Sequence, residues 1–312
     1  HVDHSDRSDR RQEITALRRT VPYLRLWKGK VFVVKAGGAA LDDEPSALAM
    51  LEQVEILHQL GIRVVLVHGG GPQASAVAEA LGGTVRFVAG RRVTDDSALE
   101  AASMVLNGSL NTRLLALCRR MGLPAVGLSG VDGGLVRARR RPPVEVPGEG
   151  LVDYGHVGDI VGVDPDVLYA QLSAGLLPIV SPLAADERGN LLNVNADTVA
   201  AAIAVGLGAE KLILLTGAPG VLEREGDPAS RISYTDLAGL ADLEARGCLS
   251  GGMKPKATAI AAAIRGGVKR VHVISQTAPD SLLLEVFTNE GSGTMIVEHT
   301  GVLSPAELSV GA

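Results

Sequence analysis

Two short stretches decide the fold: VFVVKAGG at residues 31–38 and VVLVHGGG at residues 64–71. Each is a run of mostly β-branched apolar residues that ends in glycines, which is typical of a strand buried on both faces of a parallel sheet. The first stretch carries Lys35 where strand becomes loop, and a buried ammonium is costly without an anionic partner. The glycines let the backbone approach a ligand and leave N–H groups free to face it. Together these features indicate a phosphate site at the carboxyl edge of an open sheet.

The whole chain alternates between strand and helix patterns. Apolar runs predict strands at residues 31–35, 63–67, 84–88, 125–128, 177–180, 211–215 and 270–274. Helical patterns lie between them, at residues 45–60, 72–81, 97–121, 165–174, 197–206 and 253–265. This alternation predicts an α/β fold, a three-layer αβα sandwich with a mainly parallel open sheet. The polar, Gly- and Pro-rich region at residues 132–163 is expected to form hairpins.

The bulk composition limits the classes of function. A net charge of −5 and a pI near 5.8 argue against a general nucleic-acid binder. The short basic cluster at residues 137–141 is flanked by prolines, so we expect a solvated hairpin there. Two distant cysteines fit no metal or redox spacing, and no apolar run approaches ~18 residues. We therefore expect a cytoplasmic chain with reduced thiols, no membrane span and, given its polar amino end, no signal peptide.

The amino-terminal region predicts a tail followed by a helix. Residues 1–12 are charged and lack apolar periodicity, so we expect disorder there. From Glu13 to Trp27 apolar residues recur at a spacing of three and four, which predicts a helix, with a kink or break at Pro22. The apolar stripe of this helix packs either on its own sheet or on another subunit.

The motif HGGGPQA at residues 68–74 has several possible meanings. An esterase oxyanion loop is excluded because the chain has no G-x-S-x-G nucleophile elbow. The formal match to the dinucleotide motif G-x-G-x-x-A is weak, since runs of glycine satisfy it easily, and no P-loop motif occurs. What remains is a glycine loop at a helix start that binds an anion or a transferring phosphoryl group.

Two lysines stand at unusual places. Lys35 ends a buried strand, although a lysine extending from a strand end to reach water is an ordinary alternative. Lys256, in GGMKPKATAI, falls at a predicted helix start, where the helix dipole repels cations. Such a local violation hints at function, although exposed lysines near helix ends are common.

Polar residues in two further motifs are candidate ligands. In NVNAD the residues Asn193, Asn195 and Asp197 are spaced by two before a predicted helix, so they either cap it or reach into one cleft. In GRRVTDD the guanidinium of Arg92 is suited to clamping a carboxylate, and its ordinary alternative is a surface loop residue.

The order of these motifs along the chain is more specific than any one of them. KAGG, HGGGPQ, GRRVTDD, NVNAD, LILLTGAPGVL and GGMKPK follow one another and resemble the amino acid kinase family, from about Ala16 to Val297. Within this family the chain is similar to the members that phosphorylate the side-chain carboxylate of N-acetyl-L-glutamate with MgATP in arginine biosynthesis. A carboxylate with a pKa of ~4.3 is already ionised at neutral pH, so such a reaction needs no general base. It needs in-line positioning and neutralisation of the phosphoryl charge.

The resemblance implies a role for each candidate residue. The implied catalytic residues are Lys35 and Lys256, which hold the phosphoryl group, and Asp197, which orients both lysines. The implied phosphoryl loop is Gly37, Gly38 and Gly69. The implied substrate-binding residues are Gly70, Gly71, Arg92, Asn193 and Asn195. The implied nucleotide-binding residues are Gly217, Ala218, Gly220, Val221, Leu222, Ser250, Gly251, Gly252 and Met253. Mg²⁺ is expected to bridge the ATP phosphates with few or no protein ligands, so no metal-binding residue is predicted.

The resemblance also implies lobes, an oligomer and an effector. It suggests a tail and oligomerisation helix at residues 1–27, a substrate lobe at residues 28–207 and a nucleotide lobe at residues 208–312. The helix around Pro22 is similar to the interlacing amino-terminal helix of hexameric, arginine-inhibited members, so a homo-oligomer, dimer or hexamer, is expected. Arginine is then a possible inhibitor, with Glu285 and Glu290 available to its guanidinium.

Departures from the family pattern leave alternatives open. Gly217 replaces an acid that is usual after the nucleotide strand, which puts the adenosine contacts in question. One alternative is a kinase of the same family that acts on a carrier-linked aminoadipate or glutamate. Another is a non-catalytic, arginine-sensing regulatory member, which would tolerate loss of the two lysines and Asp197.

Overall fold

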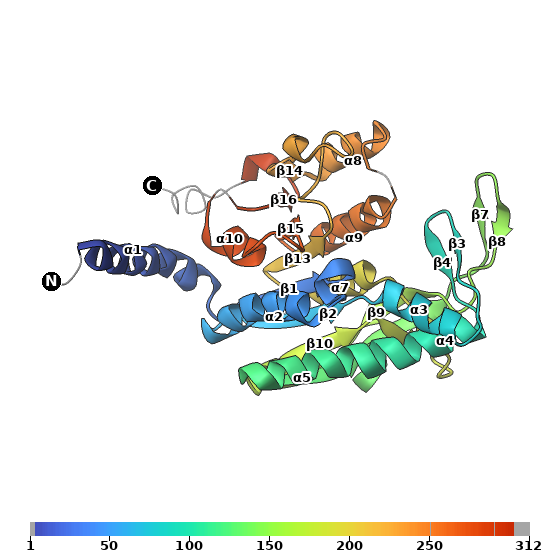
Figure 1. Ribbon diagram of the computed structural model, residues 1–312. Coiled ribbons are helices and arrows are strands. Elements are labelled where there is room, and N and C mark those ends of the chain that lie inside the picture. The colour runs from blue at the N-terminus through green and yellow to red at the C-terminus, as the bar shows by residue number, and fades with distance from the viewer. Residues whose placement is uncertain (1–3, 250, 290, 303–312) are drawn as a thin grey trace.

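The computed structural model describes residues 4–249, 251–289 and 291–302. Within these residues an eight-stranded sheet forms the centre of the molecule (Figure 1). Its strand order is β14 (Tyr234–Asp236), β16 (Thr294–Val297), β15 (Arg270–Ser275), β13 (Lys211–Thr216), β1 (Val31–Ala36), β2 (Arg63–His68), β10 (Leu177–Ser181) and β5 (Ala125–Ser129). The strands from β15 to β5 are parallel, whereas β16 and β14 run the opposite way. The carboxyl ends of β1, β2 and β13 therefore meet at one edge.

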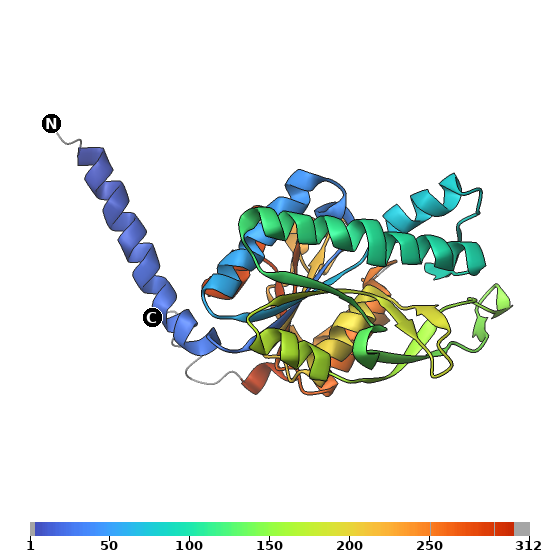
Figure 2. The same cartoon turned by 90° about the horizontal axis from the view of Figure 1, so that it is seen from below.

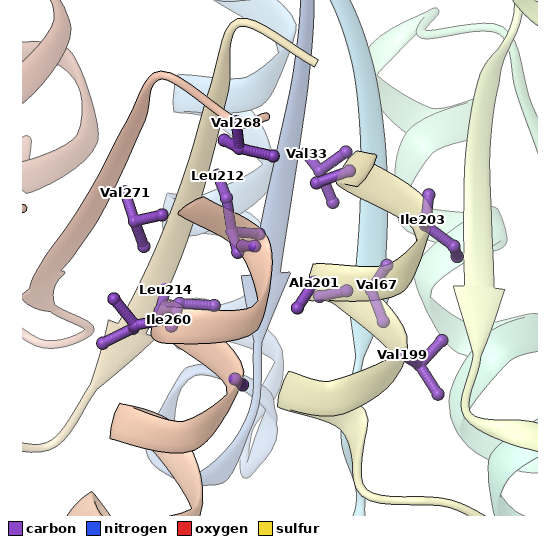
Figure 3. Close-up of a cluster of buried hydrophobic side chains, with 14 of the residues drawn as sticks. Val33, Val67, Val199, Ala201, Ile203, Leu212, Leu214, Ile260, Val268 and Val271 are labelled. Atoms are coloured by element: carbon purple, nitrogen blue, oxygen red, sulfur yellow. The ribbon is translucent and has the colours of Figure 1, made fainter. Parts of the chain in front are cut away.

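Helices cover both faces of this sheet, because successive residues of its central strands alternate between two apolar cores. On β1, Val33 faces one core and its neighbours Phe32 and Val34 face the other. The first core joins the sheet to α6 (Asp166–Ser173), α7 (Ala196–Gly206), α8 (Leu237–Ala245) and α9 (Met253–Arg265). The second joins it to α2 (Glu44–Gln59), α5 (Asn111–Met121) and α10 (Ser281–Phe287). Figure 3 shows Val33 beside α7 and Ile260 of α9 beside Leu214 in the first core. The predicted αβα sandwich is confirmed.

The polar region at residues 132–163 contributes to a second sheet. Its strands lie in the order β12 (Leu191–Asn193), β11 (Leu183–Ala185), β6 (Val136–Arg140) and β9 (Gly158–Val163). The basic cluster at residues 137–141 is therefore not the expected solvated hairpin. Its residues alternate along β6, so Ala138 is buried while Arg137 and Arg139 stay exposed.

Two hairpins project from the body near the carboxyl edge of the main sheet (Figure 1). They are β3–β4 (Arg86–Val88 and Arg91–Val93) and β7–β8 (Val144–Val146 and Gly150–Val152). Val88, Val152 and Tyr154 form a small apolar cluster between them, and the Tyr154 hydroxyl donates to the Val88 carbonyl at 3.2 Å. The strand expected at residues 84–88 is thus one arm of a hairpin outside the main sheet.

The helix α1 (His4–Trp27) stands away from the body in both views (Figures 1 and 2). The disorder expected for residues 1–12 is wrong for residues 4–12, which are helical; residues 1–3 lie outside the described residues. Extending an existing helix costs much less than starting one, which explains the longer helix. The expected break at Pro22 is also absent, since α1 continues through it as one helix, although the proline lacks the N–H that would donate to the preceding turn. No described helix is both long and apolar enough to cross a bilayer.

The long helix expected at residues 97–121 is interrupted. It consists of α4 (Asp96–Ser103), a π-helical segment at Met104–Leu110, and α5. Asp95 caps its start, where the side chain accepts from the Ala98 N–H at 2.8 Å. The π-helical segment lies against the start of α3 (Gly71–Ala80), next to the glycines that follow β2.

Candidate active site

The centre of the site is an ion bridge at the carboxyl edge of the main sheet. Asp197 lies 3.1 Å from the Nζ atom of Lys35 and 2.9 Å from that of Lys256. The side chains of Lys35, Asp197 and Lys256 are 13%, 9% and 7% exposed, so their charges depend on one another rather than on water. The structure therefore brings together the three residues predicted to be catalytic.

Two helix starts hold this bridge in place. Asp197 is in the first turn of α7, and the Asn195 side chain caps that turn by accepting from the N–H groups of Asp197 and Thr198. Lys256 is in the first turn of α9, which packs beside α7. A carboxylate between two positive helix ends is favourable, and it offsets the poor placement of the lysine. The bridge explains why Lys256 breaks the usual charge preference.

The charge states follow from the same geometry. Burial alone would raise the pKa of the Asp197 carboxyl, but the ammonium groups of Lys35 and Lys256 outweigh it and hold that pKa below its usual value. Burial lowers the pKa of Lys256; Lys35 adds to this effect, and Asp197 opposes it. Asp197 is thus ionised at neutral pH, and its carboxylate is paired with the two lysines.

The glycine loops after β1 and β2 lie side by side beneath the bridge. The Gly69 N–H donates to the Ala36 carbonyl at 2.8 Å, which joins the two loops. A Cβ atom at residue 37 would lie only 3.2 Å from the Lys35 Nζ atom, so Gly37 leaves room for that ammonium. At Gly38 the φ of +53° suits glycine. Both loops therefore present bare backbone next to a cation, as the sequence predicted.

A cavity of about 780 Å³ opens from these loops. Its walls include Lys35, Gly37, Gly38, Gly69, Gly70, Gly71, Arg92, Asn193, Asn195 and Asp197. Lys256 is not part of this lining and reaches the site through Asp197. The cavity thus gathers the residues predicted for the phosphoryl loop and the acceptor.

Arg92 is held in place by contacts within the protein. It comes from the β3–β4 hairpin, donates to the Gly71 carbonyl at 2.8 Å and also bonds the Ser75 hydroxyl. Its guanidinium lies 5.1 Å from the centre of the Phe87 ring, and partial burial lowers its pKa from the usual value. Phe87 and Ser75 line the cavity but carry no sequence motif that would have identified them.

Asn193 is positioned by residues that sequence reasoning did not assign. Its amide donates to the Thr94 hydroxyl at 3.3 Å, and its backbone N–H donates to the His156 carbonyl at 2.8 Å. Arg141 also lines the cavity, and it is paired with Asp159 at 2.8 Å. Thr94 lies inside the quoted GRRVTDD motif, so its place in that motif was the available signal.

The predicted nucleotide-binding residues lie in two segments near the bridge. Gly217, Ala218, Gly220, Val221 and Leu222 follow β13, and Gly251, Gly252 and Met253 precede or begin α9. The Val221 side chain is buried in the core, its N–H donates to the Thr294 hydroxyl at 2.8 Å and its carbonyl accepts from the Ile232 N–H at 2.9 Å, so this residue already uses its polar groups within the protein. Ser250 lies outside the described residues. The described residues of this set do not line the cavity described above.

The described side chains offer no ready-made metal site. Among them no group of three His, Cys, Asp or Glu residues is arranged to hold an ion, and both Asp197 oxygens are occupied by ammonium groups. The residues present therefore do not fit a directly coordinated Mg²⁺ ion.

Comparison with known proteins places this geometry in a family. A family model described as "Amino acid kinase family" matches residues 30–275, which include β1, β2, both glycine loops and the ion bridge. The chain belongs to the amino acid kinase family. The resemblance seen in the motifs is therefore confirmed.

This chain is similar to proteins whose names include N-acetylglutamate or acetylglutamate. It is 51% identical over 290 residues to the acetylglutamate kinase of Myxococcus xanthus, covering 91% of this chain and 94% of that protein. An N-acetylglutamate synthase from Neisseria gonorrhoeae, solved with coenzyme A and N-acetyl-glutamate, has a TM-score of 0.79 at 29% identity; the match covers 92% of this chain and 64% of the synthase chain. The synthase solved with coenzyme A and L-arginine has a TM-score of 0.78 at 26% identity, covering 95% of this chain and 74% of that chain.

The ion bridge predicts a pH-dependent contribution to stability. In Asp197→Asn two ammonium groups face each other without a counter-charge, so the free energy of unfolding at pH 7 should fall by about 3 kcal/mol. The folded pKa of Asp197 is lowered, so this stabilisation is present above the unfolded pKa of about 3.9 and is lost as pH falls through the folded value. Urea denaturation at pH 7, 5, 4 and 3 should therefore show the wild-type advantage shrinking below about pH 4.

Asp166→Asn is the matched control, because Asp166 is an exposed first-turn acid of α6. Its free energy of unfolding should change by at most about 0.5 kcal/mol. An Asp197→Asn variant as stable as this control would contradict the ion bridge.

Proposed function

We propose that the chain phosphorylates the side-chain carboxylate of N-acetyl-L-glutamate with ATP, forming the acyl phosphate in arginine biosynthesis in the cytoplasm. The observation that carries this proposal is the Lys35–Asp197–Lys256 bridge beside a cavity that holds a preorganised arginine and two asparagines. The names of the relatives support the same acceptor.

The cavity suits an acceptor with two carboxylates and an amide. The fixed guanidinium of Arg92 binds the α-carboxylate as a fork. The amide groups of Asn193 and Asn195 bond the remaining polar groups; for Asn195 only the amide nitrogen is available, because its oxygen caps α7. The N–H groups of Gly70 and Gly71 face the point where the reacting carboxylate meets the transferring phosphoryl group. This carboxylate is already ionised, so the site needs no general base.

Transfer then depends on position and charge. Lys35 and Lys256 neutralise charge on the phosphoryl oxygens, and Asp197 keeps both ammonium groups aimed at the same point. Gly37, Gly38 and Gly69 surround the phosphoryl group with backbone N–H groups. Ser250 and the segments Gly217–Leu222 and Gly251–Met253 are assigned to the border of the nucleotide site. Mg²⁺ bound to the ATP phosphates would reduce their charge, and no described side chain is assigned to hold it.

The division into lobes is part of this proposal. Residues 28–207 supply the acceptor cavity and residues 208–312 supply the nucleotide segments, although one continuous sheet joins them through β1 and β13. The two lysines therefore come from different lobes, and Asp197 connects them at the boundary.

We also propose a homo-oligomer in which α1 joins subunits as a hexamer. Its last turn is anchored, since the Tyr23 hydroxyl bonds the Asn289 side chain at 2.7 Å and Trp27 is buried. Towards the start of α1, Ile14, Leu17 and Val21 are 52%, 61% and 38% exposed and share one face. Such a stripe on a projecting helix favours burial against a second copy.

Arginine is proposed as an effector at the base of α1. The synthase solved with L-arginine supports this, as does the contact of α1 with α10. Glu285 is not a free ligand for a guanidinium, because it is buried and accepts from His272 at 2.7 Å and from the Ser292 and Gly293 N–H groups. Glu290 lies outside the described residues.

The activity is tested by trapping the acyl phosphate as a hydroxamate. We expect ATP consumption that depends on N-acetyl-L-glutamate; no turnover with it would overturn the proposal, and turnover only with carrier-linked aminoadipate would favour that alternative. Lys256→Ala should lower kcat by at least about 100-fold, because charge stabilisation of the transition state is lost. Lys254→Ala is the control, since Lys254 is exposed two residues away on α9 and should keep its kcat. Equal activity of the two variants would contradict the role of Lys256.

The oligomer is tested by light scattering of the full chain. Leu17→Glu places a charge in the exposed stripe of α1 and should reduce the mass from a hexamer to a dimer. Gln12→Glu adds the same charge on the opposite face of α1 and should leave the mass unchanged. A hexamer that survives Leu17→Glu would rule out α1 as the joining surface.

A further inference from the structure

The glycine loop after β2 rests on a buried polar pair that the proposed reaction does not use directly. His68 is the last residue of β2 and is 0% exposed; Asn111 is the first residue of α5 and is 5% exposed. They lie among Leu66, Leu114 and Ile179 of the second core. A polar pair in such surroundings is costly unless its hydrogen bonds are all made.

The hydrogen bonds of this pair determine which nitrogen of His68 carries the proton. The Asn111 Nδ2 atom lies 3.1 Å from the Ile179 carbonyl oxygen and 3.1 Å from the His68 Nε2 atom. A carbonyl oxygen only accepts, so the amide nitrogen faces both partners, and its second hydrogen points at Nε2. Nε2 therefore accepts, and burial lowers the pKa of His68 to about 4, so the ring is neutral at pH 7. Its single proton is then on Nδ1.

This proton is donated to the glycine loop. The Nδ1 atom lies 2.8 Å from the Gly69 carbonyl oxygen, so the ring holds that carbonyl towards the core. The described chain has no cis peptide bond, and in a trans peptide the carbonyl and the N–H point in opposite directions. The Gly70 N–H must therefore point away from the core, on the side where Gly69, Gly70 and Gly71 line the cavity. Within the described residues, no protein acceptor bonds this N–H.

Two irregular features of the fold lie next to the pair and the glycine loop. The π-helical segment Met104–Leu110 ends directly before Asn111, and its Leu106 and Leu110 methyl groups would lie 2.7 and 2.8 Å from a Cβ atom at Gly70. On β5, a Cβ atom at Gly127 would overlap the Asn111 side-chain oxygen. Short π-helical segments are frequent at functional sites. Gly127 thus leaves room for the Asn111 side chain, and the π-helical segment packs two leucines against the Gly70 backbone.

We propose that His68 is a positioning residue for phosphoryl transfer: its Nδ1–H fixes the Gly69 carbonyl and so directs the Gly70 N–H at the transferring phosphoryl group, while Asn111 selects the ring tautomer. This inference rests on the proposed function, because it assigns the Gly70 N–H to the transition state. Loss of one preorganised N–H donor typically lowers kcat by 10²–10³-fold.

Two substitutions of His68 separate this role from simple packing. An Asn side chain places its amide nitrogen near the position of Nδ1, whereas a Gln side chain places it near Nε2. His68→Asn should keep kcat within about fivefold of wild type, and His68→Gln should lower kcat about 100-fold. The KM values for both substrates should change less than about threefold in each variant, because the contact acts in the transition state. Wild-type kcat in His68→Gln, or equal losses of kcat in both variants, would overturn the proposal.

Neutron diffraction from crystals of the full wild-type chain gives a second test that needs no variant to fold. We expect the proton of His68 on Nδ1, facing Gly69, and an unprotonated Nε2 facing Asn111. A proton on Nε2 with none on Nδ1 would overturn the proposal. The proton position in the neutron structure does not depend on enzyme turnover. A wrong tautomer assignment can therefore be distinguished from a wrong activity, which the hydroxamate assay tests.

Discussion

The carboxylate of Asp197 between the ammonium groups of Lys35 and Lys256 is the interaction on which the site depends. Three charges with so little exposure are unfavourable singly and tolerable only as a bonded group. The group carries a net charge of +1, and two helix starts add partial positive charge beside it. Such a site favours an anion that brings several negative oxygens, as a transferring phosphoryl group does.

The fold supplies this group from three separate elements, a strand of the main sheet and two neighbouring helices of one covering layer. Lys35 comes from a central strand, Asp197 from α7 and Lys256 from α9. The apolar core between these elements contains Val33, Ile203 and Ile260, which are fully buried (Figure 3). Because a close-packed core permits little relative movement, it holds the charged ends of the three elements in register. The glycine loops then approach the lysines without side chains in between.

Much of this arrangement was predictable from the sequence, for physical reasons. Buried parallel strands are continuous apolar runs, so the six parallel strands of the central sheet and the bounds of α9 at residues 253–265 followed from pattern alone, whereas β14 and β16 were not predicted. Lys35 and Lys256 were visible because each violates a local preference. Their meeting at Asp197 required the order of the motifs and the resemblance to a family. The nucleotide segments remain a prediction, since no contact of the described residues tests them.

Several features of the fold and the site were not predicted, because they depend on contacts between segments that are distant in the sequence. The second sheet was missed because one face of β6 is solvated and its arginines resemble a hairpin. The π-helical segment was missed because its apolar residues fit an ordinary helix. The helix at residues 4–12 was missed because disorder was inferred from the charged composition of this segment. Composition does not reveal that a segment next to an existing helix becomes helical at low cost. Ser75 and His156 owe their places to tertiary contacts alone, whereas Thr94 lies inside the GRRVTDD motif but was not assigned a role.

The central claim is that both lysines, held by Asp197, bind the phosphoryl group as it passes to the acceptor. A crystal structure of the full chain with N-acetyl-L-glutamate and a non-hydrolysable ATP analogue tests it most directly. The account predicts that the Nζ atoms of Lys35 and Lys256 both lie within about 3 Å of oxygens of the γ-phosphoryl group or of the atom that links it to the nucleotide. The acceptor carboxylate should lie in line with that group, with its α-carboxylate on Arg92. A γ-phosphoryl group bound away from both lysines, with Asp197 still between them, would contradict the account.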